Sequence, residues 1–316
     1  MAVFTAVSEQ QLVAWLERYD VGRLLGFRGI AAGIENTNYF VDTERGAWVL
    51  TLVERIPEAE LPFFLRLMKH LAVRGIRCPE PVTDRAGNLS SLLNGKPATL
   101  VTRLAGTPVA VPGPSHCRAV GALLGRMHRA AADFGPAPPN PRGIGWWPGA
   151  AARLQPHLDA GTAALLHDEL AVQRAWSLTP ARSLLPASAV HADCFRDNVL
   201  FDGVDDPGVI DFYFAGHDTW TFDLAVVCND WCIDDDGRLD APRVAALLGG
   251  YQRERPLGMA ERAAWPMSLR AAALRFWLSR LYDHFLPRDA EVLSPKDPGF
   301  FERILVLRRS EPTETL

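Results

Sequence analysis

The spacing of hydrophobic positions changes about one third of the way along the chain. Before residue 105, short apolar runs rich in branched and aromatic residues alternate with turns, which is the pattern of β-strands. An Asn94-Gly95 pair between two such runs is typical of a tight hairpin. Two helices are expected here, one after the capping sequence at 8–11 and one over 60–74. The expected strands span residues 25–30, 38–41 and 48–53, with two more inside 91–101.

From about residue 115 onward the apolar positions recur at helical spacing. Val120, Leu123, Leu124 and Met127 fall on one face of a helix. The regions near the end of the chain carry apolar stripes with charged residues between them, so we expect them to be scaffold. Further helices are expected over 161–178, from 223 onward, and over 241–252, 261–285 and 299–307.

A Pro- and Gly-rich stretch at 107–114 separates the two patterns, and a hinge is expected just before it. The sequence therefore predicts an α+β protein with two lobes. The first lobe, residues 1–105, is expected to hold a five-stranded antiparallel sheet and a helix. The second lobe, residues 106–316, is expected to be mainly helical.

The composition excludes several classes of protein. The chain has 316 residues and a formal net charge of -4, so it lacks the basic excess of a protein that binds nucleic acid electrostatically. Its five cysteines are scattered and odd in number, which indicates a reducing compartment. No signal-peptide pattern and no apolar run of membrane-spanning length occur, so we expect a cytoplasmic protein without a membrane partner. The oligomeric state stays open.

The most informative stretch lies between residues 190 and 223. It contains His191-x-Asp193, then four residues and Asn198, and later Asp211 directly after a short apolar run. Short apolar runs flank each of these polar residues, so buried strands would deliver them to one rim. An isolated H-x-D is more often a turn or a helix cap, but the combination with Asp211 and Asp223 favours a kinase-like phosphotransferase.

Phosphoryl transfer depends mainly on positioning and on neutralising negative charge. The amide oxygen of Asn198 and the carboxylate of Asp211 suit a hard Mg²⁺ ion. Asp193 occupies the position of a general base that accepts the proton of the attacking hydroxyl. His191 is expected to be structural, and Asp223 is expected either to cap its helix or to brace the loop.

Two further segments have alternative interpretations. The small residues and amides at 31–37 suit a turn over phosphates, or an ordinary hairpin turn, since G-x-G-x-x-G is absent. The acidic residues at 234–236 suit either a cationic substrate or a solvated turn. Sequence alone does not separate these possibilities.

In these residues the chain resembles the aminoglycoside phosphotransferase-like and choline-kinase-like small-molecule kinases, which have the protein-kinase-like fold. Within that group it is most similar to the homoserine kinases. The broad resemblance rests on the 191–198 motif, on Ile210-Asp211 and on the triplet at 223–225. The narrower one rests on GIENTNY at 33–39, VLTL at 49–52, LPFF at 61–64, VIDFYFAG at 209–216 and NDWC at 229–232.

This resemblance implies ATP-dependent phosphorylation of the side-chain hydroxyl of L-homoserine to O-phospho-L-homoserine, on the route to threonine. It implies ATP and Mg²⁺ as cofactors, with Asp193 as base and Asn198 and Asp211 as metal ligands. The first lobe would bind the nucleotide, and the second would carry the catalytic loop and the substrate. The implied nucleotide-binding residues are Gly33, Asn36, Thr37, Asn38, Thr102 and Leu104, the substrate-binding residues are Tyr213, Asp230 and Trp231, and the structural supports are His191 and Asp223.

One position departs from the kinase pattern. Thr51 stands where the third strand of a kinase normally supplies a Lys for the phosphates, and Arg55 and Arg103 are candidates to replace that charge. Two alternatives therefore stay open beside a homoserine kinase. One is a kinase for another hydroxylated amine of the choline or aminoglycoside type, and the other is a catalytically silent nucleotide-binding module.

Overall fold

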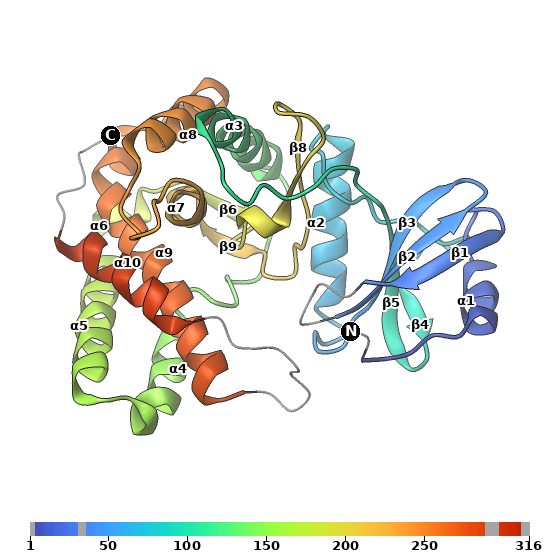
Figure 1. The fold of residues 1–316 in the computed structure, drawn as a ribbon, viewed down its shortest axis with the longest axis horizontal. Coiled ribbons are helices and arrows are strands. Elements are labelled where there is room, and N and C mark those ends of the chain that lie inside the picture. Colours follow the sequence, from blue (N-terminus) through green and yellow to red (C-terminus); the bar gives the residue numbers. More distant parts are fainter. Residues whose placement is uncertain (1–3, 31–35, 288–296, 311–316) are drawn as a thin grey trace. The chain divides into compact units, whose positions relative to one another are not determined.

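The computed structural model describes residues 4–30, 36–287 and 297–310. The chain divides into two compact units, Met1–Ala105 and Gly106–Leu316 (Figure 1). In the part of the chain that the structure describes, no helix is both long enough and apolar enough to cross a membrane. All five cysteines are free and buried.

The first unit contains the predicted five-stranded antiparallel sheet, which is confirmed. Its strand order is β1-β2-β3-β5-β4. Asn94 and Gly95 form the turn between the last two strands, with φ of 50° and 75°, as a two-residue hairpin turn requires. The strands are β1 (Leu24–Gly29), β2 (Thr37–Thr43), β3 (Gly46–Leu52), β4 (Ser91–Leu93) and β5 (Lys96–Thr102).

Two helices accompany this sheet, α1 (Glu9–Leu16) and α2 (Leu61–Val73). The predicted capping box starts α1, because Ser8 Oγ accepts a hydrogen bond from the Gln11 amide and Gln11 Oε1 accepts one from the Ser8 amide. Helix α1 buries one apolar face in the same hydrophobic core as the sheet. That core includes Leu12, Trp15, Leu16, Tyr39, Val41, Leu50, Leu52 and Leu100.

The second unit is mainly helical, with two small antiparallel sheets. Its central helix α7 is buried on all sides from Thr221 to Trp231, and α3, α8, α9 and the pair β6–β9 surround it (Figure 1). The helices are α3 (Pro114–Ala131), α4 (Trp147–Leu154), α5 (Ala160–Ser177), α6 (Pro180–Ser183), α7 (Trp220–Trp231), α8 (Ala241–Glu254), α9 (Met259–Phe285) and α10 (Pro298–Ser310). The sheets pair β6 (Ala187–Val190) with β9 (Gly216–Thr219) and β7 (Val199–Phe201) with β8 (Pro207–Val209), and 3₁₀ turns occur at Gln155–His157 and Arg196–Asn198.

Some elements of the second unit differ from the predictions. Strand β9 was not predicted, because the sequence Gly-His-Asp-Thr contains no apolar run, and its place is fixed by pairing with β6. Helix α4 was also not predicted. Helix α7 begins at Trp220 rather than at Asp223, which puts Asp223 in its first turn.

Helices α3 and α8 pack with their backbones in contact. A Cβ atom at Gly121 would lie 2.1 Å from the Leu247 carbonyl oxygen, and one at Gly250 would lie 2.0 Å from the Arg118 carbonyl oxygen. Both distances are far shorter than van der Waals contact, so only glycine fits at these two positions. The neighbouring Gly249 has no atom within 4 Å of such a Cβ.

We predict opposite effects for alanine at these adjacent glycines of α8. Gly250→Ala should lower the free energy of unfolding by about 1–3 kcal/mol, because the added methyl group forces the two helices apart. Gly249→Ala is the matched control and should be neutral, or stabilising by up to about 1 kcal/mol through helix propensity. Urea unfolding followed by tryptophan fluorescence measures both. Equal stabilities for the two variants would contradict the described contact.

Candidate active site

The predicted motif forms a loop between β6 and β7, at one end of the small sheets. Strand β6 ends at Val190, β7 begins at Val199, and the segment after β8 carries Asp211. The Ile210 amide donates to the Asn198 carbonyl oxygen at 2.9 Å, so the two polar segments lie side by side. The strands therefore bring Asp193, Asn198 and Asp211 to one region, as their spacing suggests.

Asp193 is held by two donors on opposite sides of its carboxylate. The Asn198 side-chain amide donates to the backbone carbonyl oxygen of Asp193 at 2.9 Å and to Oδ2 of its carboxylate at 3.1 Å. The guanidinium group of Arg275, on α9, donates to Oδ1 at 3.1 Å. Arg275 is buried, with its side chain 4% exposed, and it forms an ion pair with Asp193. This contact fixes the direction of the carboxylate.

Asp223 braces the same loop from inside the second unit, and does not cap α7. Its Oδ1 accepts from the Ala192 amide at 2.7 Å, and its Oδ2 accepts from the His191 amide at 3.2 Å. His128 on α3 makes a third contact, with Nε2 at 3.0 Å from Oδ2. Burial by itself raises the pKa of Asp223, but the hydrogen bonds from His128 and from the Ala192 amide outweigh it, so the pKa is lowered.

The backbone around the loop contains two strained residues. Ala192 and Asp211 both have a φ of 62°, in the left-handed region that non-glycine residues rarely adopt. Such conformations cost on the order of 1–3 kcal/mol each and persist where neighbouring contacts determine them. The hydrogen bond between the Ala192 amide and Asp223 supplies such a contact. Strained backbone at these two positions is typical of a functional site.

His191 links the loop to the segment that carries Asp211. Its Nε2 donates to the Ile210 carbonyl oxygen at 3.0 Å, and its Nδ1 accepts from the Asp193 amide at 3.3 Å. Its ring also packs edge-on against Phe212, with 4.7 Å between ring centroids. Burial lowers the pKa of His191, so the imidazole is neutral and has its proton on Nε2. These contacts agree with a structural rather than a chemical role.

Asn198 and Asp211 have the donor atoms that a magnesium ion requires. The Asn198 amide nitrogen points to Asp193, which leaves the carbonyl oxygen of that side chain as a possible ligand. Asp211 is exposed on the adjacent segment. Among the described residues, no group of three or more His, Cys, Asp or Glu is positioned to hold a metal. Two protein oxygens with phosphate and water oxygens are nevertheless a usual Mg²⁺ shell, so the residues fit that ion.

The predicted nucleotide residues lie in the first unit, and Gly33 is outside the described residues. The other three on this segment have partners within the unit. Asn36 Oδ1 accepts from the Glu54 amide at 3.2 Å, Thr37 Oγ1 donates to Glu54 Oε1 at 2.8 Å, and Asn38 Oδ1 accepts from Thr51 Oγ1 at 2.7 Å. Their side chains therefore anchor the start of β2 to the end of β3.

The other two predicted nucleotide residues, Thr102 and Leu104, also lie in the first unit, as do Arg103 and Thr51. Thr102 Oγ1 accepts from the Glu80 amide at 2.9 Å, and Leu104 is half-buried just after β5. Arg103, a candidate to replace the strand Lys, instead pairs with Asp42 at 3.2 Å. Thr51 is buried and bonded to Asn38, so it brings no charge to the sheet.

The predicted substrate residues have different surroundings from those expected. Trp231 is fully buried and donates from Nε1 to the Cys194 carbonyl oxygen at 3.1 Å, so its placement as a substrate contact is wrong. Asp230 is bound to Arg196, whose amide donates to it at 2.7 Å and whose guanidinium group lies 3.2 Å away. Burial raises the pKa of Asp230, and Arg196 acts against that rise. Tyr213 is half-buried in the turn after Asp211.

The acidic run at 234–236 forms a turn. Asp234 Oδ1 accepts hydrogen bonds from the amides of Asp236 and Arg238, at 3.0 and 2.8 Å. This is the solvated turn that the sequence left as one of two alternatives.

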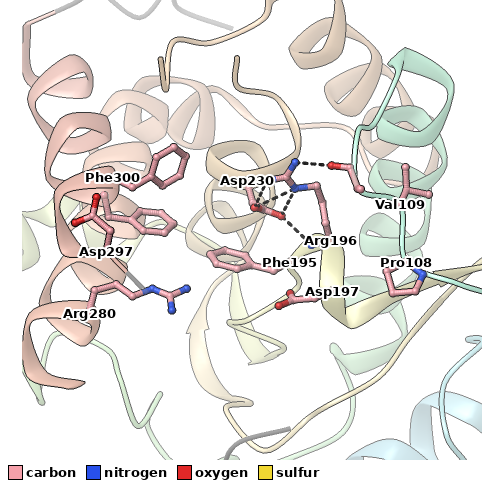
Figure 2. Close-up of a pocket in the computed structure, with 11 residues that line it drawn as sticks. Pro108, Val109, Phe195, Arg196, Asp197, Asp230, Arg280, Asp297 and Phe300 are labelled. Carbon is pink, nitrogen blue, oxygen red and sulfur yellow. Dashed lines mark hydrogen bonds and ion pairs between the residues drawn. The ribbon is translucent and has the colours of Figure 1, made fainter. Parts of the chain in front are cut away.

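A cavity of about 460 Å³ lies beside the loop within the second unit (Figure 2). Phe195 from the loop packs against Phe276 of α9, with 4.2 Å between ring centroids, and against Phe301 of α10, with 5.9 Å between ring centroids. The last helices, expected to be only scaffold, therefore supply part of the wall. The residues that line the cavity are Pro108, Val109, Ala110, Phe195, Arg196, Asp197, Asp230, Arg280, Asp297, Phe300 and Phe301.

Comparison with known proteins shows the class to which this fold and loop belong. A profile described as "Phosphotransferase enzyme family" matches residues 26–257, and the chain belongs to this family. Among curated relatives, the homoserine kinase of Janthinobacterium sp. (strain Marseille) is 50% identical, with 100% of this chain and 98% of that protein covered. The homoserine kinase of Methylobacillus flagellatus is 50% identical over 96% of this chain and 94% of its own length. The predicted family is thus confirmed.

Solved structures confirm the predicted fold class. An amicoumacin kinase in complex with AMP-PNP and Ca²⁺ matches with a TM-score of 0.72 at 16% identity, covering 96% of this chain and 93% of that one. Identity this low supports the fold alone. The specific chemistry must therefore be argued from the residues of this chain.

We predict that the buried neutral His191 makes the protein less stable in mild acid. Its folded pKa lies below 6.5, so the unfolded chain binds more protons as the pH falls through that value. The free energy of unfolding should fall between pH 7.5 and 5.5, by up to about 1.4 kcal/mol per pH unit from this residue. Urea unfolding at several pH values should show a smaller slope for His191→Gln. The exposed His167→Gln should keep the parent slope, and equal slopes in both variants would refute the assignment.

Proposed function

We propose that this protein is an ATP-dependent homoserine kinase, which phosphorylates the side-chain hydroxyl of L-homoserine to O-phospho-L-homoserine. The observation that carries the proposal is the Asp193 carboxylate, held by Asn198 and Arg275 beside the segment of Asp211. Relatives of nearly the same length, 50% identical, support the choice of substrate. The five free thiols agree with a reducing compartment, so we place the reaction in the cytoplasm.

The mechanism follows from the positions of these side chains. Asp193 accepts the proton of the substrate hydroxyl. At the same time the hydroxyl oxygen bonds to the γ-phosphorus of ATP, and the bond between that phosphorus and the leaving oxygen of ADP breaks. Asn198 and Arg275 hold the carboxylate toward the hydroxyl, which is a positioning role. Asn198 and Asp211 would hold Mg²⁺, which neutralises phosphate charge when bound.

The nucleotide contacts in this proposal come mainly from the backbone. Asn36, Thr37 and Asn38 use their side chains within the first unit, so these residues would meet phosphates through their backbone N–H groups. The backbone at Thr102 and Leu104 would meet the adenine. Because Thr51 carries no charge, the metal ion and these amides take a larger share of phosphate neutralisation than in a kinase with the strand Lys.

The substrate is tested by measuring ADP release with Mg²⁺ and ATP. L-homoserine, L-serine, L-threonine, choline and an aminoglycoside are supplied in turn, and we expect turnover selective for L-homoserine. Turnover with choline or the aminoglycoside alone would retain a kinase and reject the proposed substrate. Nucleotide binding without turnover of any alcohol would favour a silent binding module.

Replacing the base isolates the chemical step. Asp193→Asn should lower kcat about 10²–10⁴-fold, because the amide cannot accept the hydroxyl proton. ATP affinity, measured by calorimetry, should change little. The matched control is Asp205→Asn, which removes the same charge from an exposed turn between β7 and β8. Parent-like turnover in Asp193→Asn would contradict the base assignment.

A further inference from the structure

One charged side chain of the cavity has no part in this mechanism. Arg280 projects from α9 into the cavity (Figure 2). Within residues 4–30, 36–287 and 297–310, no side chain or backbone group forms a hydrogen bond or ion pair with its guanidinium group. Burial lowers the pKa of Arg280, and the charges of Asp283 and Asp193 act in the opposite direction. An arginine stays protonated even so. Asp197 and Asp230 also attract it, but none of these four carboxylates bonds it directly, so the donors of its guanidinium group remain available to an incoming anion.

The other arginine of this cavity is already occupied. Arg196 binds Asp230 through its amide and its guanidinium group, and it also donates to the Ala110 carbonyl oxygen at 2.9 Å. The charges of Arg196 and Asp230 therefore cancel each other, and their hydrogen bonds hold the loop in place. Of the two arginines in the described lining, Arg280 is therefore the one available to an incoming anion.

Helix α9 places Arg280 close to the reacting group. Arg275 on this helix is bonded to Asp193, and the ring of the next residue, Phe276, packs against that of Phe195 in the loop, with 4.2 Å between ring centroids. Arg280 follows Phe276 by four residues, which is about one helical turn on the same face. Its cavity therefore adjoins the loop that carries Asp193. A volume of about 460 Å³ is within the usual range for small-molecule sites.

L-homoserine carries its hydroxyl and its α-carboxylate at opposite ends of a short chain. With the hydroxyl at Asp193, the carboxylate must enter a neighbouring space and needs a cation there. Asp197 and Asp297 also line this cavity, so its walls carry both signs of charge, as a zwitterion requires. A purely cationic amine would instead meet repulsion from Arg280.

We infer that Arg280 recognises the α-carboxylate of the amino-acid substrate through paired hydrogen bonds from its guanidinium group. The inference rests on the proposed function and adds the source of its specificity. A planar guanidinium fork matches a carboxylate better than the point charge of a lysine. Arg280 thus makes the enzyme select an amino acid over amino alcohols that lack a carboxylate.

The test compares L-homoserine with 3-aminopropan-1-ol, which is homoserine without its carboxylate. In Arg280→Met, the KM for L-homoserine should rise roughly 10- to 200-fold, as expected for the loss of hydrogen bonds to a charged group. The preference for L-homoserine over the amino alcohol, as a ratio of kcat/KM values, should shrink by a similar factor. The KM for ATP should change far less. Arg280→Lys should recover only part of the preference.

Arg262→Met is the matched control. It removes the same charge from the same helix, 18 residues away or roughly 27 Å along the axis, where Arg262 bonds Gln252 and the Leu257 carbonyl oxygen. This control should keep the parent preference. Thermal unfolding establishes whether each variant is folded. If Arg280→Met is unfolded, Arg280→Lys tests the assignment instead, and its preference for L-homoserine over the amino alcohol should be smaller than that of the parent enzyme.

The outcomes separate the inference from the proposed function. If the parent enzyme prefers L-homoserine and Arg280→Met lowers kcat/KM equally for both substrates, Arg280 acts on the transferred phosphate or on the fold. That result overturns the carboxylate assignment alone. If the parent enzyme uses 3-aminopropan-1-ol but not L-homoserine, the proposed function and the carboxylate assignment both fall.

Discussion

The carboxylate of Asp223 is the contact on which the candidate active site depends. It accepts hydrogen bonds from two successive loop amides, and His128 supplies a third contact. Hydrogen bonds to a charged group contribute about 1.5–3 kcal/mol each, so two of them exceed the cost of one left-handed residue such as Ala192. Because Asp223 belongs to a helix that is buried on all sides, the loop is held by the core of the second unit. The direction of Asp193 is set from there.

Much of this arrangement could be predicted from short-range patterns. The sheet of the first unit follows from alternating runs and from the Asn94-Gly95 turn, which depend only on neighbouring residues. The grouping of Asp193, Asn198 and Asp211 follows from fixed spacing between short strands. In both cases the local preference and the final structure agree, which is why periodicity was informative.

The remaining features depend on contacts between residues distant in sequence, which no local pattern encodes. Arg275 reaches Asp193 across 82 positions, and His128 reaches Asp223 across 95. The only sign of Arg275 in the sequence was an arginine within the apolar stripe of α9, a helix that the sequence analysis interpreted as scaffold. Trp231 failed in the opposite way, since its motif suggested a substrate contact while packing buries it completely. Burial is a property of the assembled helices and not of the motif.

The glycine contact between α3 and α8 has a consequence for genetic studies of this protein. His128 on α3 also bonds Tyr251 on α8 at 2.7 Å, so the separation of these two helices sets how His128 approaches Asp223. A screen that selects only for growth would score Gly121 and Gly250 as if they touched substrate. Measuring the amount of protein in each surviving clone, beside its growth, would distinguish a displaced helix from a lost chemical group.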